Sequence, residues 1–117
     1  IESTTSVTYV ARATAGPSIV LPLAGDYMVE IGYTGTNGTN AAGNIMSYDI
    51  GGTGAVDADG VLTQNAGTTN SVYFTASRVN KKTGLTAVTL TAKYRVSSGG
   101  TAEFRYRWMA VTPVRVQ

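Results

Sequence analysis

The chain contains no cysteine and no histidine. Without cysteine it has no disulfide and no thiolate nucleophile, and without histidine it has no imidazole base and no imidazole metal ligand. These absences exclude most nucleophilic and zinc-dependent mechanisms, which leaves a pair of carboxylates as the enzymatic option. No acidic residue lies in a segment with the pattern of a formed pocket. We therefore expect a protein that is not an enzyme and has no catalytic residue, no cofactor and no metal.

Charge is also scarce. Charged residues make up 14% of the sequence, against about 25% in an average soluble domain. The net charge of +2 is too small to predict binding to nucleic acid. No apolar run approaches the roughly 18 residues of a membrane helix, so we expect no membrane span. Threonine, glycine, alanine and valine dominate instead, and they favour strands and turns.

The hydrophobic pattern predicts strands throughout one domain, which we place at residues 1–117. Apolar residues recur at every second position, whereas helical periodicity does not persist beyond a turn or two. We expect strands at 4–13, 45–50, 61–62 and 71–79, and a short edge strand at 18–23. A further strand at 27–33 has a buried face that carries Tyr27, Val29, Ile31 and Tyr33. The polar, glycine-rich stretches 34–43, 51–60 and 64–70 are predicted to be exposed loops.

The last third has the most regular alternation. Residues 88–96 and 102–110 each present one apolar and one polar face, and glycines lie between them. We expect a long hairpin with Leu90 opposite Trp108 and Arg95 opposite Glu103, because that register pairs apolar with apolar residues. Trp108 would then lie in the core. Residues 111–116, interrupted by Pro113, would form an edge strand.

Seven or eight short strands with frequent turns predict an all-β fold, a single-domain antiparallel β-sandwich. A jelly roll is the favoured arrangement, and an immunoglobulin-like sandwich is the alternative.

The polar face of the predicted hairpin carries Lys93, Arg95, Arg105 and Arg107, with Lys81 and Lys82 in a loop nearby. Arginines beside apolar residues are typical of protein interfaces. We therefore predict an interaction site on this face, and the alternative is a solvated sheet face whose charges prevent edge aggregation. The site residues are Lys93, Arg95, Arg105, Arg107 and Met109.

The segment Asp57-Ala58-Asp59-Gly60 is similar to the opening of a calcium-binding loop. It lacks the later ligands and the closing glutamate, so an Asp-Gly turn is the preferred interpretation. A hydrolase that uses Asp57 and Asp59 is a third functional hypothesis.

Three segments resemble the ends of small β-sandwich virion proteins of tailed bacteriophages. They are the strand 87–96, the glycine turn with its following strand at 99–104, and the tail 108–116, which ends in Pro-Val-Arg-Val. The turn and strand start at 23–27 also resemble these proteins. The resemblance implies a trimeric domain that decorates the capsid or forms the tip of a fibre, and it carries over no catalytic residue.

We accordingly expect a virion protein, a head decoration or cementing protein that binds the capsid lattice as an oligomer. Its partners would be the major capsid protein or another virion protein and two further copies of itself, but neither nucleic acid nor a membrane. Residues 1–6 are expected to form a flexible arm. The alternative is a receptor-binding fibre tip that recognises a bacterial surface glycan through residues 34–43 and 51–60.

Overall fold

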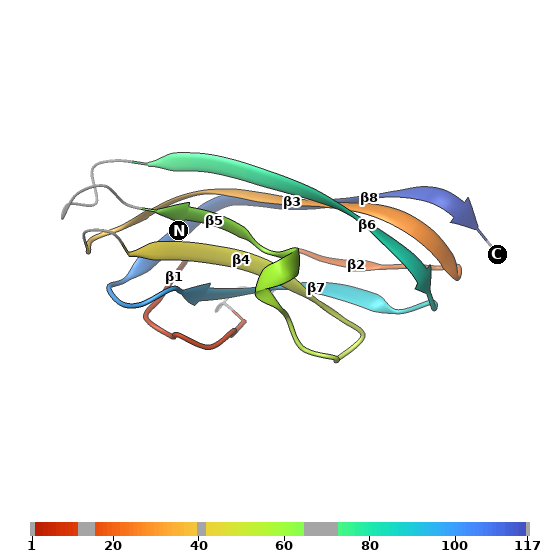
Figure 1. Cartoon of the computed structure of the whole chain (residues 1–117), viewed down its shortest axis with the longest axis horizontal. Coiled ribbons are helices and arrows are strands. Elements are labelled where there is room, and N and C mark those ends of the chain that lie inside the picture. The colour runs from red at the N-terminus through yellow and green to blue at the C-terminus, as the bar shows by residue number, and fades with distance from the viewer. Residues whose placement is uncertain (1, 12–15, 40–41, 65–72, 117) are drawn as a thin grey trace.

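Two four-stranded antiparallel sheets pack face to face in the computed structural model (Figure 1), which describes residues 2–11, 16–39, 42–64 and 73–116. Sheet A contains, in spatial order, β1 (Glu2–Thr4), β8 (Ala102–Val116), β3 (Gly25–Asn37) and β6 (Phe74–Leu85). Sheet B contains β2 (Ser18–Val20), β7 (Thr89–Val96), β4 (Gly43–Ile50) and β5 (Val61–Gln64). One 3-10 turn, η1 (Asp57–Asp59), precedes β5. The predicted all-β fold is confirmed, and none of the described residues form a helix able to cross a membrane.

The inner faces of the two sheets form the core. The predicted buried face of β3 is confirmed, since Tyr27, Val29, Ile31 and Tyr33 are at most 2% exposed. On β7, the inward residues Leu90, Ala92, Tyr94 and Val96 are fully buried. The Phe104 ring of β8 lies between Tyr33 and Tyr94, with centroid distances of 4.9 and 4.8 Å. Aromatic packing in this tilted and edge-on geometry therefore joins the sheets.

Polar groups inside this core also join the sheets. The hydroxyl of Tyr33 donates to the Asn44 carbonyl at 2.6 Å, and the Asn44 side-chain amide donates to the Thr36 carbonyl at 2.8 Å. Burial raises the pKa of Tyr33, because the tyrosinate would lose its hydration. The Tyr33 hydroxyl and the Asn44 amide nitrogen cost little to bury because they are hydrogen-bonded, whereas Asn44 Oδ1 is buried without a partner among the described residues.

The predicted hairpin is wrong: β7 and β8 lie in different sheets, and residues 97–101 cross between them. The alternation predicted correctly that Tyr94 and Phe104 both point inward. However, two strands of one sheet and two strands that face each other across a core show the same alternation. Arg95 therefore does not face Glu103. The two side chains lie on opposite outer faces of the molecule.

A β-bulge in β8 reverses the predicted side of Trp108. Trp108 pairs with Gly32 and Arg105 pairs with Thr34, so two residues of β8 stand opposite the single residue between Gly32 and Thr34. Within this bulge Tyr106 has a φ of 48°. One extra residue shifts the alternation by one position. Trp108 therefore lies on the outer face of sheet A, and the prediction that it belongs to the core is wrong.

The N-terminal prediction is also corrected. The predicted strand at 4–13 and the flexible arm are replaced by β1, which pairs with Phe104, Glu103 and Ala102 of β8. Residues 5–11, here called the strap, then run along the free edge of β7. The backbone N–H of Val96 donates to Ser6, and Val10 exchanges two hydrogen bonds with Tyr94. The strap thus satisfies the exposed edge of a sheet.

Strands β3 and β6 extend further along the chain than predicted. β3 continues to Asn37, so the predicted loop at 34–43 is a strand over its first residues. β6 reaches Leu85 and includes Lys81 and Lys82, which were predicted to lie in a loop. The short edge strand at 18–23 is confirmed as β2. Residues 65–70 of the predicted polar turn lie outside the described residues.

Candidate functional site

The outer face of sheet B is covered from one side by residues 51–60. The hydroxyl of Ser47, on β4, donates to the Val56 carbonyl at 2.7 Å. Its neighbour on the same face, Ile45, is only 7% exposed, and its Cγ2 would lie 3.0 Å from a β-carbon added to Gly60. The end of this segment, which includes η1, therefore lies close against β4.

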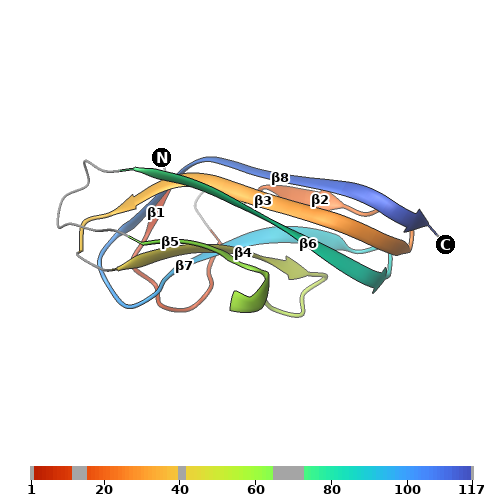
Figure 2. The same cartoon turned by 45° about the horizontal axis from the view of Figure 1, so that its top comes forward.

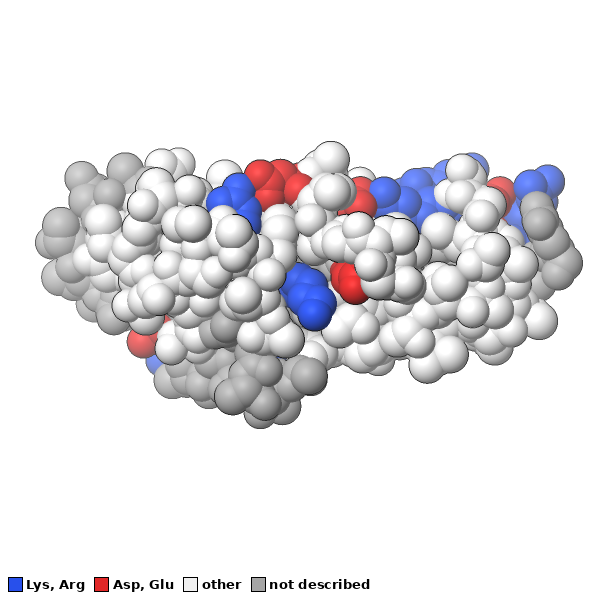
Figure 3. Space-filling model, turned by 90° about the horizontal axis from the view of Figure 1, so that it is seen from below, with Lys and Arg blue, Asp and Glu red and all other residues white. Residues whose placement is uncertain are grey.

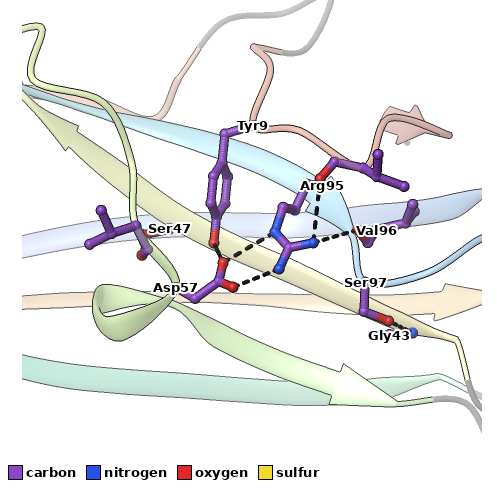
Figure 4. Close-up of polar contacts among 9 residues, drawn as sticks. Tyr9, Gly43, Ser47, Asp57, Arg95, Val96 and Ser97 are labelled. Carbon is purple, nitrogen blue, oxygen red and sulfur yellow. Dashed lines mark hydrogen bonds and ion pairs between the residues drawn. The ribbon is translucent and has the colours of Figure 1, made fainter.

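The strap reaches the same face from the other side, and three side chains join it to η1 (Figure 4). Arg95 of β7 donates from Nε to Asp57 Oδ1 at 3.1 Å and from Nη2 to Asp57 Oδ2 at 2.6 Å. The hydroxyl of Tyr9, on the strap, donates to the same Oδ1 at 2.5 Å. We call Tyr9, Asp57 and Arg95 the clamp. A bidentate arginine–carboxylate pair is strongly directional, so the clamp fixes both segments over sheet B.

Further contacts hold the clamp arginine in place. Arg95 Nη1 donates to the Val96 carbonyl at 2.9 Å and to the Val7 carbonyl, in the strap, at 3.4 Å. Its guanidinium lies 5.5 Å from the centroid of the Tyr9 ring, within range of a cation–π contact. Arg95 therefore contacts the strap, β7 and η1 at once, which its position in the sequence does not indicate.

The clamp changes the acidity of its members. Hydrogen bonds from Arg95, and then from Tyr9, hold the pKa of Asp57 below its ordinary value of 3.8. Burial, followed by the hydrogen bond to Asp57, raises the pKa of Tyr9 to about 12. The ion pair with Asp57 raises the pKa of Arg95 further. At neutral pH Asp57 is therefore ionised, Tyr9 is a neutral phenol and Arg95 is charged, which are the states that form these hydrogen bonds. The clamp thus has a structural role.

The five residues of the predicted interaction site do not share one face. Lys93 and Arg95 lie on β7 in sheet B, whereas Arg105, Arg107 and Met109 lie on β8 in sheet A. The premise of a single basic patch is wrong, because the predicted hairpin that would bring these strands together is absent from the described structure. Their role in binding a partner stays a prediction.

Each of the β8 residues has its own surroundings. Arg105 stacks 4.3 Å from the Tyr73 ring centroid and lies 3.7 Å from the Glu103 carboxylate. Arg107 donates to the Gly16 carbonyl at 3.2 Å and to the Tyr94 hydroxyl at 3.3 Å. Met109 points inward after the bulge and packs against the core. These side chains are thus engaged within the molecule.

Figure 3 views the side of the molecule that carries sheet B. Its blue and red side chains alternate along one long edge, and the rest of the surface is largely uncharged. This distribution differs from a continuous basic surface.

The two carboxylates of the calcium-like segment form ion pairs with different basic side chains. Asp57 belongs to the clamp, and Asp59 forms an ion pair with Lys82 of β6 at 2.5 Å. No group of three or more potential metal ligands was found among the residues that the structure describes. The segment forms η1 followed by Gly60, close to the predicted Asp-Gly turn.

A scan against protein-family models finds no match to this chain, and a search of curated proteins finds none either. Functional inference therefore starts from the fold and from the residues themselves.

Proposed function

We propose that the protein is a structural component of a bacteriophage virion, a head decoration or cementing protein that binds the capsid lattice as a homotrimer. The proposal depends first on strand connectivity. We infer that the sandwich is a jelly roll, an architecture that occurs in viral capsid proteins. The resemblance of residues 87–116 to small virion proteins supports the same assignment.

The pairing pattern is the observation that carries this proposal. β1 pairs with β8, β2 with β7, β3 with β6, and β4 with β5. Nested pairs of this kind support a jelly roll, in which one long antiparallel hairpin is rolled into two sheets. An immunoglobulin-like sandwich has a different strand order, with consecutive hairpins inside each sheet.

The location of the chain in virions tests the proposal. Purified virions from the source of the sequence would be separated into heads and tails and probed with an antibody against this chain. We expect the chain in the head fraction, and light scattering of the purified protein should give the mass of a trimer. Absence from both fractions would overturn the virion assignment, and a monomeric mass would overturn the trimer.

The second candidate is a receptor-binding fibre tip, and exposed aromatic residues favour it. Tyr106 is 78% exposed, and Tyr73 and Phe74 are each 38% exposed. The loops that were expected to bind a glycan are less suitable, because 34–37 belongs to β3 and 51–60 lies against sheet B. Detection of the chain in the tail fraction of the same experiment would favour this candidate over the first.

A further inference from the structure

The indole ring of Trp108 lies flat on the outer face of sheet A. A β-carbon built on Gly32 would lie 2.0, 2.3 and 2.6 Å from three atoms of its six-membered ring, Cζ2, Cη2 and Cε2. A point at the edge of a ring has one near atom and clearly more distant neighbours. Three similar distances indicate a point above the ring face. The ring therefore covers Gly32 with one face and turns its other face outward, and Trp108 is partly exposed.

The register of sheet A determines what surrounds this ring. Figure 2 shows β3 running between β8 and β6, and Gly32 pairs with Trp108 on one side and with Ser77 on the other. One step along the same face, Glu30 pairs with Ala110 and Val79. Toward Glu30, the ring is thus bordered by one hydroxyl, one carboxylate and two apolar side chains, and in the other direction Thr34 pairs with Arg105 and Thr75.

The polar groups of this face are available to a ligand. Ser77 is exposed, and Glu30 is half-buried and has no hydrogen bond or ion pair with any residue that the structure describes. Val79 is 50% exposed and extends the apolar surface beside Glu30.

We infer that Trp108, Glu30 and Ser77 form a binding platform for a pyranose saccharide. A pyranose with equatorial hydroxyls has a flat C–H face that packs on an aromatic ring, and hydroxyls at its rim that donate to a carboxylate. The ring and the carboxylate lie on neighbouring strands and two residues apart along the sheet, about 7 Å, which suits one sugar unit. Ser77 supplies a second hydrogen-bonding group across the ring.

The charge of Glu30 discriminates between possible ligands. An apolar protein surface laid over this face would bury the carboxylate without a hydrogen-bond donor, which is costly. Sugar hydroxyls instead donate hydrogen bonds to the carboxylate and bring no charge of their own. The inference does not depend on the virion proposal, and the two are tested by separate measurements.

Trp108 is the single tryptophan of the chain, so its fluorescence reports directly on the platform. Cellotetraose, chitotetraose and mannotetraose are the probes, and saturation-transfer NMR on the sugar protons is the second readout. We expect saturable quenching by at least one probe. Trp108→Ala should weaken binding at least tenfold by NMR, and Glu30→Gln should weaken it several-fold with the ring in place.

Leu62→Ala is the control, because it removes an apolar side chain that is 54% exposed on β5 of sheet B, away from the platform on sheet A. It should bind as the wild type does. Circular dichroism of each variant verifies its fold. The inference is overturned if none of the three sugars changes the fluorescence or the NMR signal, or if Trp108→Ala and Glu30→Gln both bind with wild-type affinity.

Discussion

The two outer faces of this sandwich are used differently. On sheet B, the strap and residues 51–60 lie over β7 and β4, and the clamp joins them. On sheet A, Arg105 contacts Tyr73 and Glu103 near one end of β8. Further along β8, Trp108 lies flat over Gly32 and is partly exposed. The contrast indicates which face is stabilised by the chain itself and which is available to a partner.

The difference follows from which backbone edges and side chains already have partners. Arg95 binds a carboxylate from η1 and carbonyls from the strap and β7, so it retains little capacity for a ligand. Glu30, at an equivalent outward position, binds none of the described residues.

The largest effect is expected from a substitution under the Trp108 ring, on the outer face of sheet A. Gly32→Ala places a β-carbon inside the contact distance of the Trp108 ring, so the ring must move away from β3. We expect a loss of about 1–3 kcal/mol in the free energy of unfolding, as for other overpacked sites. Urea unfolding measures this loss, and the tryptophan emission should shift to the red as the ring becomes more exposed.

Gly99→Ala is the control for this substitution. A β-carbon at Gly99 meets no atom within 4 Å, so the same change of residue type should leave stability and emission nearly unaltered. Unchanged emission in Gly32→Ala would contradict the flat placement of Trp108.

The next largest effect is expected from the clamp on the outer face of sheet B. Arg95→Met keeps the aliphatic part of the side chain but removes all its hydrogen bonds to Asp57, Val96 and Val7. Because Asp57 is largely exposed, we expect a cost of only about 1 kcal/mol, measured by urea unfolding at pH 7. Limited proteolysis should also cleave the strap faster.

Arg115→Met is the matched variant, since Arg115 also forms an ion pair, with Asp26 at 3.3 Å, but is 66% exposed. It should cost about 0–0.5 kcal/mol. An equal loss in both variants would show that the clamp is no stronger than an ordinary surface ion pair.

The sequence predicted the core better than either outer face. Alternation identified the inward residues of β3 and β7 because one face of each strand is buried and the other is polar. From Trp108 to Val111 both faces of β8 are apolar, so the alternation could not reveal the bulge. Gly32 was the available signal, because a glycine inside a strand often marks a close approach. The clamp left no signal, since its hydrogen bonds join residues 38 and 48 positions apart.

Acid should weaken the clamp selectively. The pKa of Asp57 is lowered in the folded protein, so its contribution to stability is present above about pH 4 and is lost as pH falls through the folded-state pKa. The wild type should therefore be more stable than Asp57→Asn at pH 6, and this difference should shrink toward pH 2. Urea midpoints across that range measure it, and a difference that does not vary with pH would contradict the role of the Asp57 charge.

The smallest effect is expected from Tyr9→Phe, which removes one hydrogen bond of the clamp at a cost of about 0.5 kcal/mol at pH 7. The pKa of Tyr9 is raised from 10.0 to about 12 on folding, so its contribution is complete below pH 10 and is lost as pH rises through 12. The advantage of the wild type over the variant should thus shrink between pH 10 and pH 12 in urea unfolding. An advantage that does not vary with pH would show that ionisation of the Tyr9 phenol is not involved. Saccharide binding by Trp108 should stay unchanged in this variant, because Tyr9 lies on the strap over sheet B and the platform lies on the outer face of sheet A.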